Sequence, residues 1–457
     1  MLKRMLKDCV PTIIALTFSG LYSIIDGLFV GNAAGDTGLA AINLAWPIPA
    51  FITAVGLGIG TGGSILYSNA KGKGEWAQAE KLLHTTMFLL AAGALLVMAV
   101  LWFCHPMLLR LLGARSEVYA QAESYSRIII LGSLFQIGGA GIVPLLRNLS
   151  MPVEAMQAMI VGMLTNLGLN YMLIVKAGMG ITGAAIGTII AQCVVCAICL
   201  FRMWKSGVRI RSQLKKDGMM QNRMQQKKDS IENKKAQDVA AILKTGFPAF
   251  GVSLAPTVVL MFTNLQCLNY GGNEAVAAYA VISYIVFPIQ SLLQGVGDGL
   301  QPLMSYYIGA GEKEKLQQLK KYAYRIILML GSMSLVAAIG CQRWIGNWFH
   351  LSEEAAVFFA GGFVISALSF LFYGFSKFNV AYMNSNLKVK TANGLIYGEC
   401  LVISPILIFG LPVLFGMRGI WISLPATSVT MLLIYGIKKP FILKNLKIKD
   451  FIRKDKK

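Results

Sequence analysis

Four ionisable side chains lie inside long apolar stretches of the sequence: Asp26, Asp298, Lys377 and Glu399. A charge in hydrocarbon costs at least about 2.5 kcal/mol, so each should face a water-filled cavity or a partner of opposite charge. A carboxylate in a partly dehydrated cavity can take up and release a proton near neutral pH. Asp26 and Asp298 therefore predict binding and release of a cation. The alternative is that each acid is hydrogen-bonded locally and supports a helix kink.

Lys377 and Glu399 lie on consecutive apolar stretches, each about seven or eight positions from the turn between them. Because a helix rises about 1.5 Å per residue, both side chains are expected about 11 Å from that turn, at the same depth. We interpret them as a structural ion pair rather than as a coupling site.

The elements that must position these groups are apolar segments of membrane-spanning length. The chain of 457 residues is 56% hydrophobic and 14% charged, with a mean hydropathy of +0.61, whereas soluble proteins carry about 25% charged residues. About 20 helical residues cross the hydrocarbon core of a bilayer. The sequence thus predicts an all-α membrane protein with twelve transmembrane helices, at 10–31, 38–69, 84–106, 128–147, 155–175, 183–204, 240–266, 275–308, 323–345, 359–384, 391–415 and 419–437.

The two halves of the chain share residues at one fixed offset of 237 positions. The offset relates Pro11 to Pro248, Gly58 to Gly295, Gly62 to Gly299 and Gly72 to Gly309. Six spans per half leave both halves in the same orientation, so a parallel internal repeat is expected to relate the lobes. We predict an N-lobe at 1–204, a basic linker at 205–239, a C-lobe at 240–441 and a basic tail at 442–457. Gly72 and Gly309 are interpreted as ordinary turn residues and used only as repeat markers.

Positive charge is distributed unevenly between the two sides of the predicted helices. Net charge is +21, and most of the 42 Lys and Arg residues lie in the N-terminus and in loops after even-numbered spans. By the positive-inside rule, both termini and the 205–239 linker are cytoplasmic, in a multi-pass protein of the cell membrane. The same basicity favours anionic lipid, and no folded basic surface is available to bind nucleic acid.

The two acids occupy different places in the repeat. The residue equivalent to Asp26 in the other lobe is Thr263, and the residue equivalent to Asp298 is Thr61. Each lobe carries one acid where the other has a neutral threonine, which packing of a duplicated fold does not require. We therefore expect the N-lobe and the C-lobe to have different roles in the function of the protein. The residues predicted for a C-lobe substrate cavity are Asp298, Gln294, Gln301 and Asn264.

Metal and enzyme chemistry is not indicated. Cys193, Cys196 and Cys199 share one stripe of an apolar helix and are interpreted as packing residues, with no disulfide framework. The three histidines are isolated near span ends, and neither a magnesium nor a zinc ligand pattern is present. We expect a transporter rather than an enzyme, with no metal site and no cofactor.

Four further motifs are distinctive: YSIIDGLFVG at 22–31, GMGITGAAIGT at 178–188, GVGDGLQP at 295–302 and GIWISLP at 419–425. They resemble motifs of multidrug and toxic compound extrusion (MATE) transporters, most closely those of the MepA-like branch. The similarity covers nearly the whole chain. It implies a monomeric antiporter in the lipid bilayer that exports amphipathic, often cationic, small molecules by alternating access. A proton or Na⁺ gradient would drive the export. The expected physiological role is xenobiotic export and antibiotic resistance.

The resemblance also implies a coupling-cation site made by Asp26, Asn166, Asn170 and Thr188. Asn170 stands where the family often has a second acid, and Ser428 stands where an acid often follows the proline of the last span. One formal negative charge suffices for a proton and binds Na⁺ less well, so protons are favoured while Na⁺ stays open. The alternatives are a flippase or exporter of a lipid-linked or other endogenous metabolite in the same superfamily, and a passive channel.

Overall fold

The structure, a computed structural model, describes the backbone of residues 1–216, 235–348 and 352–438. Side chains are described for the same residues except 22–28, 30–37, 39–40, 206–216, 235, 346–348 and 437–438. Throughout these ranges the regular elements are helices. Part of the predicted linker, 217–234, and the predicted tail, 442–457, lie outside the described residues.

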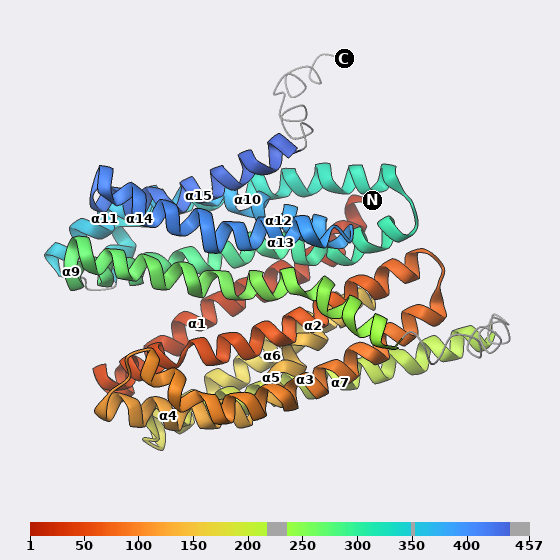
Figure 1. Cartoon of the computed structure of the whole chain (residues 1–457), viewed down its shortest axis with the longest axis horizontal. Coiled ribbons are helices and arrows are strands. Elements are labelled where there is room, and N and C mark those ends of the chain that lie inside the picture. The colour runs from red at the N-terminus through yellow and green to blue at the C-terminus, as the bar shows by residue number, and fades with distance from the viewer. Residues whose placement is uncertain (217–234, 349–351, 439–457) are drawn as a thin grey trace, which may run out of the picture.

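The N-terminal half forms one bundle (Figure 1). Its elements are α1 (Leu2–Ala45), α2 (Pro47–Gly72), α3 (Trp76–Leu111), α4 (Ser116–Leu131), α5 (Ser133–Asn148), α6 (Pro152–Asn170), the π-helix η1 (Tyr171–Lys176) and α7 (Gly180–Lys216). Pro47 and Pro152 occupy the first turns of α2 and α6, where a missing N–H costs no hydrogen bond.

The C-terminal half forms the second bundle, above the first in Figure 1. Its elements are α9 (Lys235–Gly309), α10 (Lys313–Trp348), α11 (Glu353–Ala367), α12 (Phe370–Ser385), α13 (Val389–Gly398), the π-helix η2 (Glu399–Ile403), α14 (Ser404–Phe415) and α15 (Met417–Lys438). α9 is two helices that meet at Gly272, whose φ of 65° interrupts the helical backbone.

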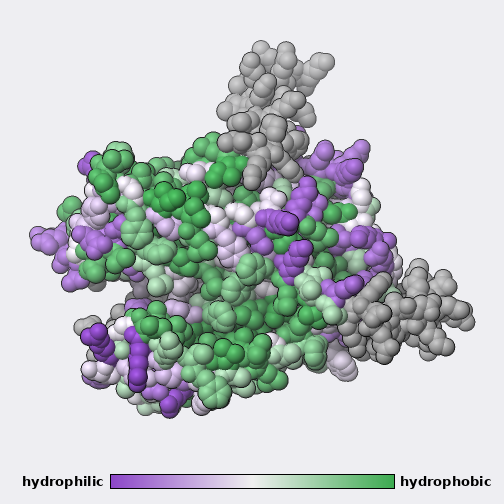
Figure 2. Space-filling model, viewed as in Figure 1, coloured by the Kyte–Doolittle hydropathy of each residue, from purple (hydrophilic) through white to green (hydrophobic). Residues whose placement is uncertain are grey.

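The predicted twelve spans are confirmed. Eight helices of the described residues are long and apolar enough to cross a membrane, and two bent pairs bring the number to ten. Counting α9 as two helices and adding α1, whose middle lies outside the searched residues, gives twelve. Figure 2 shows hydrophobic side chains over the middle of both lobes and hydrophilic ones toward the two ends.

The internal repeat extends to the bends within spans. α4 and α5 meet at 57°, and α11 and α12 meet at 48°, so the broken span of one lobe has its counterpart in the other at the same offset of 237. Ser150 and Leu387, which follow these spans, share a positive φ of 65° and 55°. The broken span and the turn that follows it therefore repeat in backbone conformation, whereas the π-helices η1 and η2 lie at positions that are not equivalent.

The first helix of each lobe reaches across to the other lobe. Met5 and Cys9 of α1 belong to a hydrophobic core cluster of the C-lobe, and Ile242 of α9 belongs to the core of the N-lobe. The lobes make contact mainly through α2 and α1 against α9. At the end of the molecule where α4 and α11 lie, which is opposite the end that bears the N-terminus, Figure 2 shows a notch between the lobes.

Candidate functional site

A chain of buried polar side chains links α6 to α7 in the N-lobe. Asn170 Nδ2 donates to Asn166 Oδ1 over 2.8 Å, and Asn166 Nδ2 donates to Thr188 Oγ1 over 3.2 Å. Asn166 is 3% exposed and Asn170 is fully buried. Three of the four residues predicted for the coupling-cation site are thus brought together in one hydrogen-bonded row, which supplies oxygen atoms in a setting that excludes bulk water.

Local backbone features make room for this row. A Cβ atom built on Gly187 would lie 2.7 Å from Asn170 Oδ1, so a larger residue at 187 would displace the asparagine amide from its observed position. The π-helix η1 begins at Tyr171, directly after Asn170. π-helical turns inside α-helices occur often at functional sites, because they shift the direction of neighbouring side chains.

Asp26 lies in α1, and its side chain is outside the described residues. α1 packs against both α6 and α7, so the helix that carries the acid lies beside the helices that carry the amide row. The complete four-residue cation site remains a prediction.

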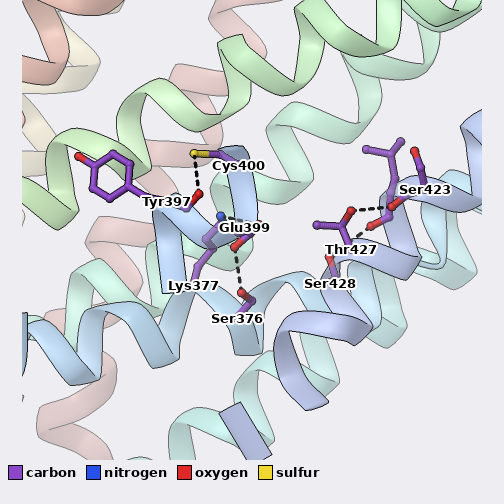
Figure 3. A network of polar contacts seen from close by, with 9 residues as sticks. Ser376, Lys377, Tyr397, Glu399, Cys400, Ser423, Thr427 and Ser428 are labelled. Carbon is purple, nitrogen blue, oxygen red and sulfur yellow. Dashed lines mark hydrogen bonds and ion pairs between the residues drawn. The ribbon is translucent and has the colours of Figure 1, made fainter. Parts of the chain in front are cut away.

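In the C-lobe, Lys377 of α12 forms an ion pair with Glu399, the first residue of η2. Lys377 Nζ lies 2.9 Å from Glu399 Oε1, and Ser376 Oγ donates to Glu399 Oε2 over 3.2 Å. The Lys377 ammonium also lies 5.0 Å from the centre of the Tyr373 ring. Both partners are buried, and Figure 3 shows them pointing toward each other between α12 and η2. The equal depth expected from the sequence is therefore correct, while the structural role of the pair stays a prediction.

The ion pair forms part of the wall of a cavity of about 50 Å³ in the C-lobe. This volume holds water, but it is well below the roughly 300 Å³ that drug-sized ligands occupy. Polar groups on the wall besides the pair are Tyr279, Ser283, Gln290, Tyr373, Ser404, Ser423, Thr427 and Ser428. In this conformation the cavity therefore fits water rather than a drug, and it must widen before it can hold one.

Hydroxyl groups on this wall use their protons within their own helices. Ser423 Oγ donates to Ile420 O over 2.6 Å, and Thr427 Oγ1 donates to Ser423 O over 2.8 Å (Figure 3). Ser283 Oγ donates to Ala280 O in the same way. Since each hydroxyl carries one proton and two lone pairs, these groups offer acceptors to whatever enters the cavity.

The residues predicted for the C-lobe cavity are placed elsewhere. Asp298, Gln294, Gln301 and Asn264 are not among the residues that line it. Asp298 Oδ2 accepts a hydrogen bond of 3.2 Å from Gln294 Nε2 on the same helix, and Gln301 bonds across to the N-lobe. Spacing along a helix does not tell which neighbouring helix a polar side chain faces, so a substrate cavity lined by these four residues stays a prediction.

The cavity also contains residues that sequence reasoning passed over. Tyr279, Tyr373, Ser283 and Ser404 are common residue types with no distinguishing spacing. The i, i+4 spacing of Ser423 and Thr427, followed by Ser428, could have indicated a polar face on the last span. No group of three or more His, Cys, Asp or Glu side chains within the described residues is arranged to hold a metal ion.

Comparison with known proteins agrees with this architecture. A model of the family described as MatE matches residues 11–172 and 248–398. The chain is 24% identical over 446 residues to the multidrug export protein MepA of Staphylococcus saprophyticus, covering 95% of this chain and 94% of that protein. It is 23% identical over 448 residues to MepA of Staphylococcus aureus, with the same shares covered.

Solved structures show the same fold. One is the outward-facing conformation of a multidrug resistance MATE family transporter of the MOP superfamily, with a TM-score of 0.84, 19% identity, and 97% of this chain and 96% of that chain covered. A MOP superfamily transporter from Pyrococcus furiosus matches with a TM-score of 0.84, 20% identity and the same shares covered. At these identities the likeness concerns the arrangement of the helices.

Proposed function

Because the chain belongs to the MatE family of transporters, we propose that it is a secondary active antiporter that exports amphipathic, cationic compounds in exchange for a proton or Na⁺. The observation that carries the proposal is that two duplicated lobes meet tightly at one end and leave a notch at the other (Figure 2). A transporter that alternates between two sides of a membrane requires this state and a second one in which the other end is open. Bound ligand must favour one of the two states.

The distribution of Lys and Arg indicates which side of the membrane the notch between the lobes faces. Lys and Arg are concentrated in the N-terminus, the linker and the tail, so the closed end is assigned to the cytoplasm by the positive-inside rule. The notch then faces outward.

Asp26 with Asn166, Asn170 and Thr188 is proposed to bind the coupling cation. The amide row supplies oxygens that accept hydrogen bonds or coordinate a cation, and Asp26 supplies one negative charge. One charge is sufficient to carry a proton, so proton coupling is favoured over Na⁺. Both lobes belong to one chain, and a monomer is therefore expected to complete the cycle.

A lipid-linked precursor is disfavoured as substrate. Its pyrophosphate head group would need positive charge in the cavity, and Lys377 on the C-lobe cavity wall is neutralised by Glu399.

Drug resistance and dye efflux in a host that lacks its own pumps test the proposal. Wild-type protein should export a cationic dye, an uncoupler should abolish the export, and Asp26→Asn should be inactive at equal abundance in the membrane. Export that continues after the gradient is collapsed would indicate a channel and contradict antiport.

A further inference from the structure

At the closed end, Gly72 packs against the Tyr306 backbone and Gly309 against the Asn69 backbone, so glycine contacts occur on both sides of the interface. The same end contains a polar contact between the lobes that this glycine packing does not require. Asn148, the last residue of α5, faces Gln301 of α9. Asn148 Nδ2 donates to Gln301 Oε1 over 2.9 Å, and Gln301 Nε2 lies 3.4 Å from Asn148 Oδ1 in the reverse direction. The two amides are 3% and 5% exposed. They therefore form a reciprocal pair inside the interface.

Hydroxyl groups complete this pair on both sides. Ser68 Oγ of α2 donates to Asn148 Oδ1 over 2.6 Å, and Gln301 Nε2 donates to Ser305 Oγ over 2.9 Å. Ser68 and Ser305 occupy equivalent positions of the two repeats, 237 apart, and both are buried. The bonds to Ser68 and Ser305 lie within one lobe each, whereas the two bonds between Asn148 and Gln301 exist only while the lobes stay together. A buried polar group is costly unless it is paired, so these two bonds favour the closed state.

Each amide has a charged neighbour on its own helix. Arg147 precedes Asn148 on α5, and Asp298 lies one helical turn before Gln301 on α9. The Arg147 guanidinium lies 3.7 Å from Met159 Sδ within the N-lobe, and the Asp298 carboxylate accepts from Gln294 of its own helix. The polar contact between the lobes is therefore the amide pair, and we name Asn148 and Gln301 the interlobe latch.

The interlobe latch breaks the symmetry of the repeat. Ser385 stands at the position equivalent to Asn148, and Ser64 at the position equivalent to Gln301. Ser64 Oγ bonds within its own helix to Thr61 O, and the buried Ser385 Oγ makes no hydrogen bond. The glycine contacts occur on both sides of the interface, whereas the reciprocal amide pair occurs on one. A requirement of the duplicated fold would not produce this difference.

We propose that the interlobe latch holds the lobes together at the end that bears the N-terminus, and that its opening is the step that exposes the transport pathway to that side. The inference rests on the alternating access of the proposed function and is independent of the coupling ion. An apolar seal of the same size would resist wetting when the lobes part. Amides exchange their partners for water when the lobes part, so opening costs only the modest net contribution of these hydrogen bonds rather than their full strength.

Cys9 provides a native reporter of the closed end. It is 1% exposed, its Sγ lies 3.9 Å from Val296 O, and a Cβ on Gly299 would lie 2.9 Å from its Cα. Opening of this end exposes its thiol. Cys199 and Cys267 are fully buried inside the N-lobe and the C-lobe, so they become reactive only when a lobe unfolds.

The test measures alkylation of each cysteine by N-ethylmaleimide in the purified full chain, with quantification by mass spectrometry. Gln301→Leu should increase the rate of labelling of Cys9 by roughly tenfold, as loss of one or two buried hydrogen bonds predicts, with Cys199 and Cys267 unchanged. Gln136→Leu is the matched control, because Gln136 is a buried amide of α5, the helix that carries Asn148, and it bonds to Pro49 O and Thr53 Oγ1 within the N-lobe. It should leave the labelling of Cys9 at the wild-type rate.

Two results would overturn the interlobe latch: no increase at Cys9 in Gln301→Leu, or an equal increase in Gln136→Leu. If Gln301→Leu unfolds and labels all three cysteines, Gln301→Asn decides, since it keeps the amide and shortens its reach. Selective labelling of Cys9 in that variant supports the proposal, and a wild-type rate contradicts it. Because labelling requires neither a gradient nor a drug, failure of the proposed antiport would leave this result interpretable.

Discussion

Gly72 of α2 and Gly309 of α9 face each other at equivalent positions of the two repeats. A Cβ on Gly72 would overlap Tyr306 O, and a Cβ on Gly309 would overlap Asn69 O. Asn69 and Tyr306 are themselves 237 positions apart. The pseudo-twofold axis therefore passes between the two glycines, and the lobes meet backbone to backbone there.

Further glycine contacts repeat on either side of that axis. A Cβ on Gly58 would lie 3.1 Å from Phe250 Cβ, and one on Gly295 would lie 2.9 Å from Ile13 Cα. Phe250 and Ile13 are equivalent residues, as are Gly58 and Gly295. We call these glycine contacts between the lobes the seal. It contains two equivalent sets of contacts, one with the first helix of each lobe.

Gly309→Ala should weaken the seal. Its methyl group meets backbone of the other lobe, which cannot move aside as a side chain can, so the lobes must separate. We expect faster alkylation of Cys9 and a lower thermal midpoint. Gly394→Ala is the control, because Gly394 is helical with no atom within 4 Å of a built Cβ, and alanine there should be neutral or stabilise by up to about 1 kcal/mol. Equal behaviour of the two variants would contradict the seal.

Removal of either partner of the Lys377–Glu399 pair should destabilise the protein. Lys377→Met or Glu399→Gln leaves a buried charge without its partner, which costs about 3–5 kcal/mol. The exchange Lys377→Glu with Glu399→Lys should recover most of this loss, as measured by thermal unfolding in detergent. Lys315→Met is the control, because the Lys315–Glu312 pair is largely exposed and exposed pairs contribute less than about 1 kcal/mol. Two additive defects in the exchanged protein would show that the pair is not structural.

Asn170→Asp should change the coupling ion. A second carboxylate beside Asn166 raises the negative charge of the N-lobe site, and the near-identical shape of Asp and Asn suits the space left by Gly187. We expect export driven by an imposed Na⁺ gradient to rise at least several-fold over wild type. Asn264→Asp, in the other lobe, should not produce this gain. Unchanged ion preference in Asn170→Asp would place the cation elsewhere.

The sequence was sufficient where a pattern has one physical solution. Apolar length predicted the spans, and equal distance from a shared turn predicted that Lys377 and Glu399 lie at one depth, where their atoms are 2.9 Å apart. The offset of 237 predicted the duplication, which the structure repeats down to the bends at α4–α5 and α11–α12.

The sequence was insufficient where the partner lies on another helix. Gly72 and Gly309 were interpreted as ordinary turn residues, whereas each packs against backbone of the opposite lobe. Gln301 bonds to Asn148 in the other lobe, a partner that spacing along one helix does not indicate. A single helix shows which face is polar, but the neighbour of that face depends on how twelve helices pack. The π-helices η1 and η2 also escaped prediction, because hydrophobic periodicity does not distinguish them from α-helix.

Export driven by a cation gradient is expected to depend on Asp26, the acid within the predicted span of α1. Uptake of a cationic dye into proteoliposomes that contain the purified protein, under an imposed pH gradient, compares wild type with Asp26→Asn and with Asp8→Asn, an acid of the same helix outside that span. We expect gradient-dependent transport in wild type and Asp8→Asn, and loss of at least about 90% of it in Asp26→Asn. Full gradient-driven transport by Asp26→Asn would show that this carboxylate does not couple the gradient to export.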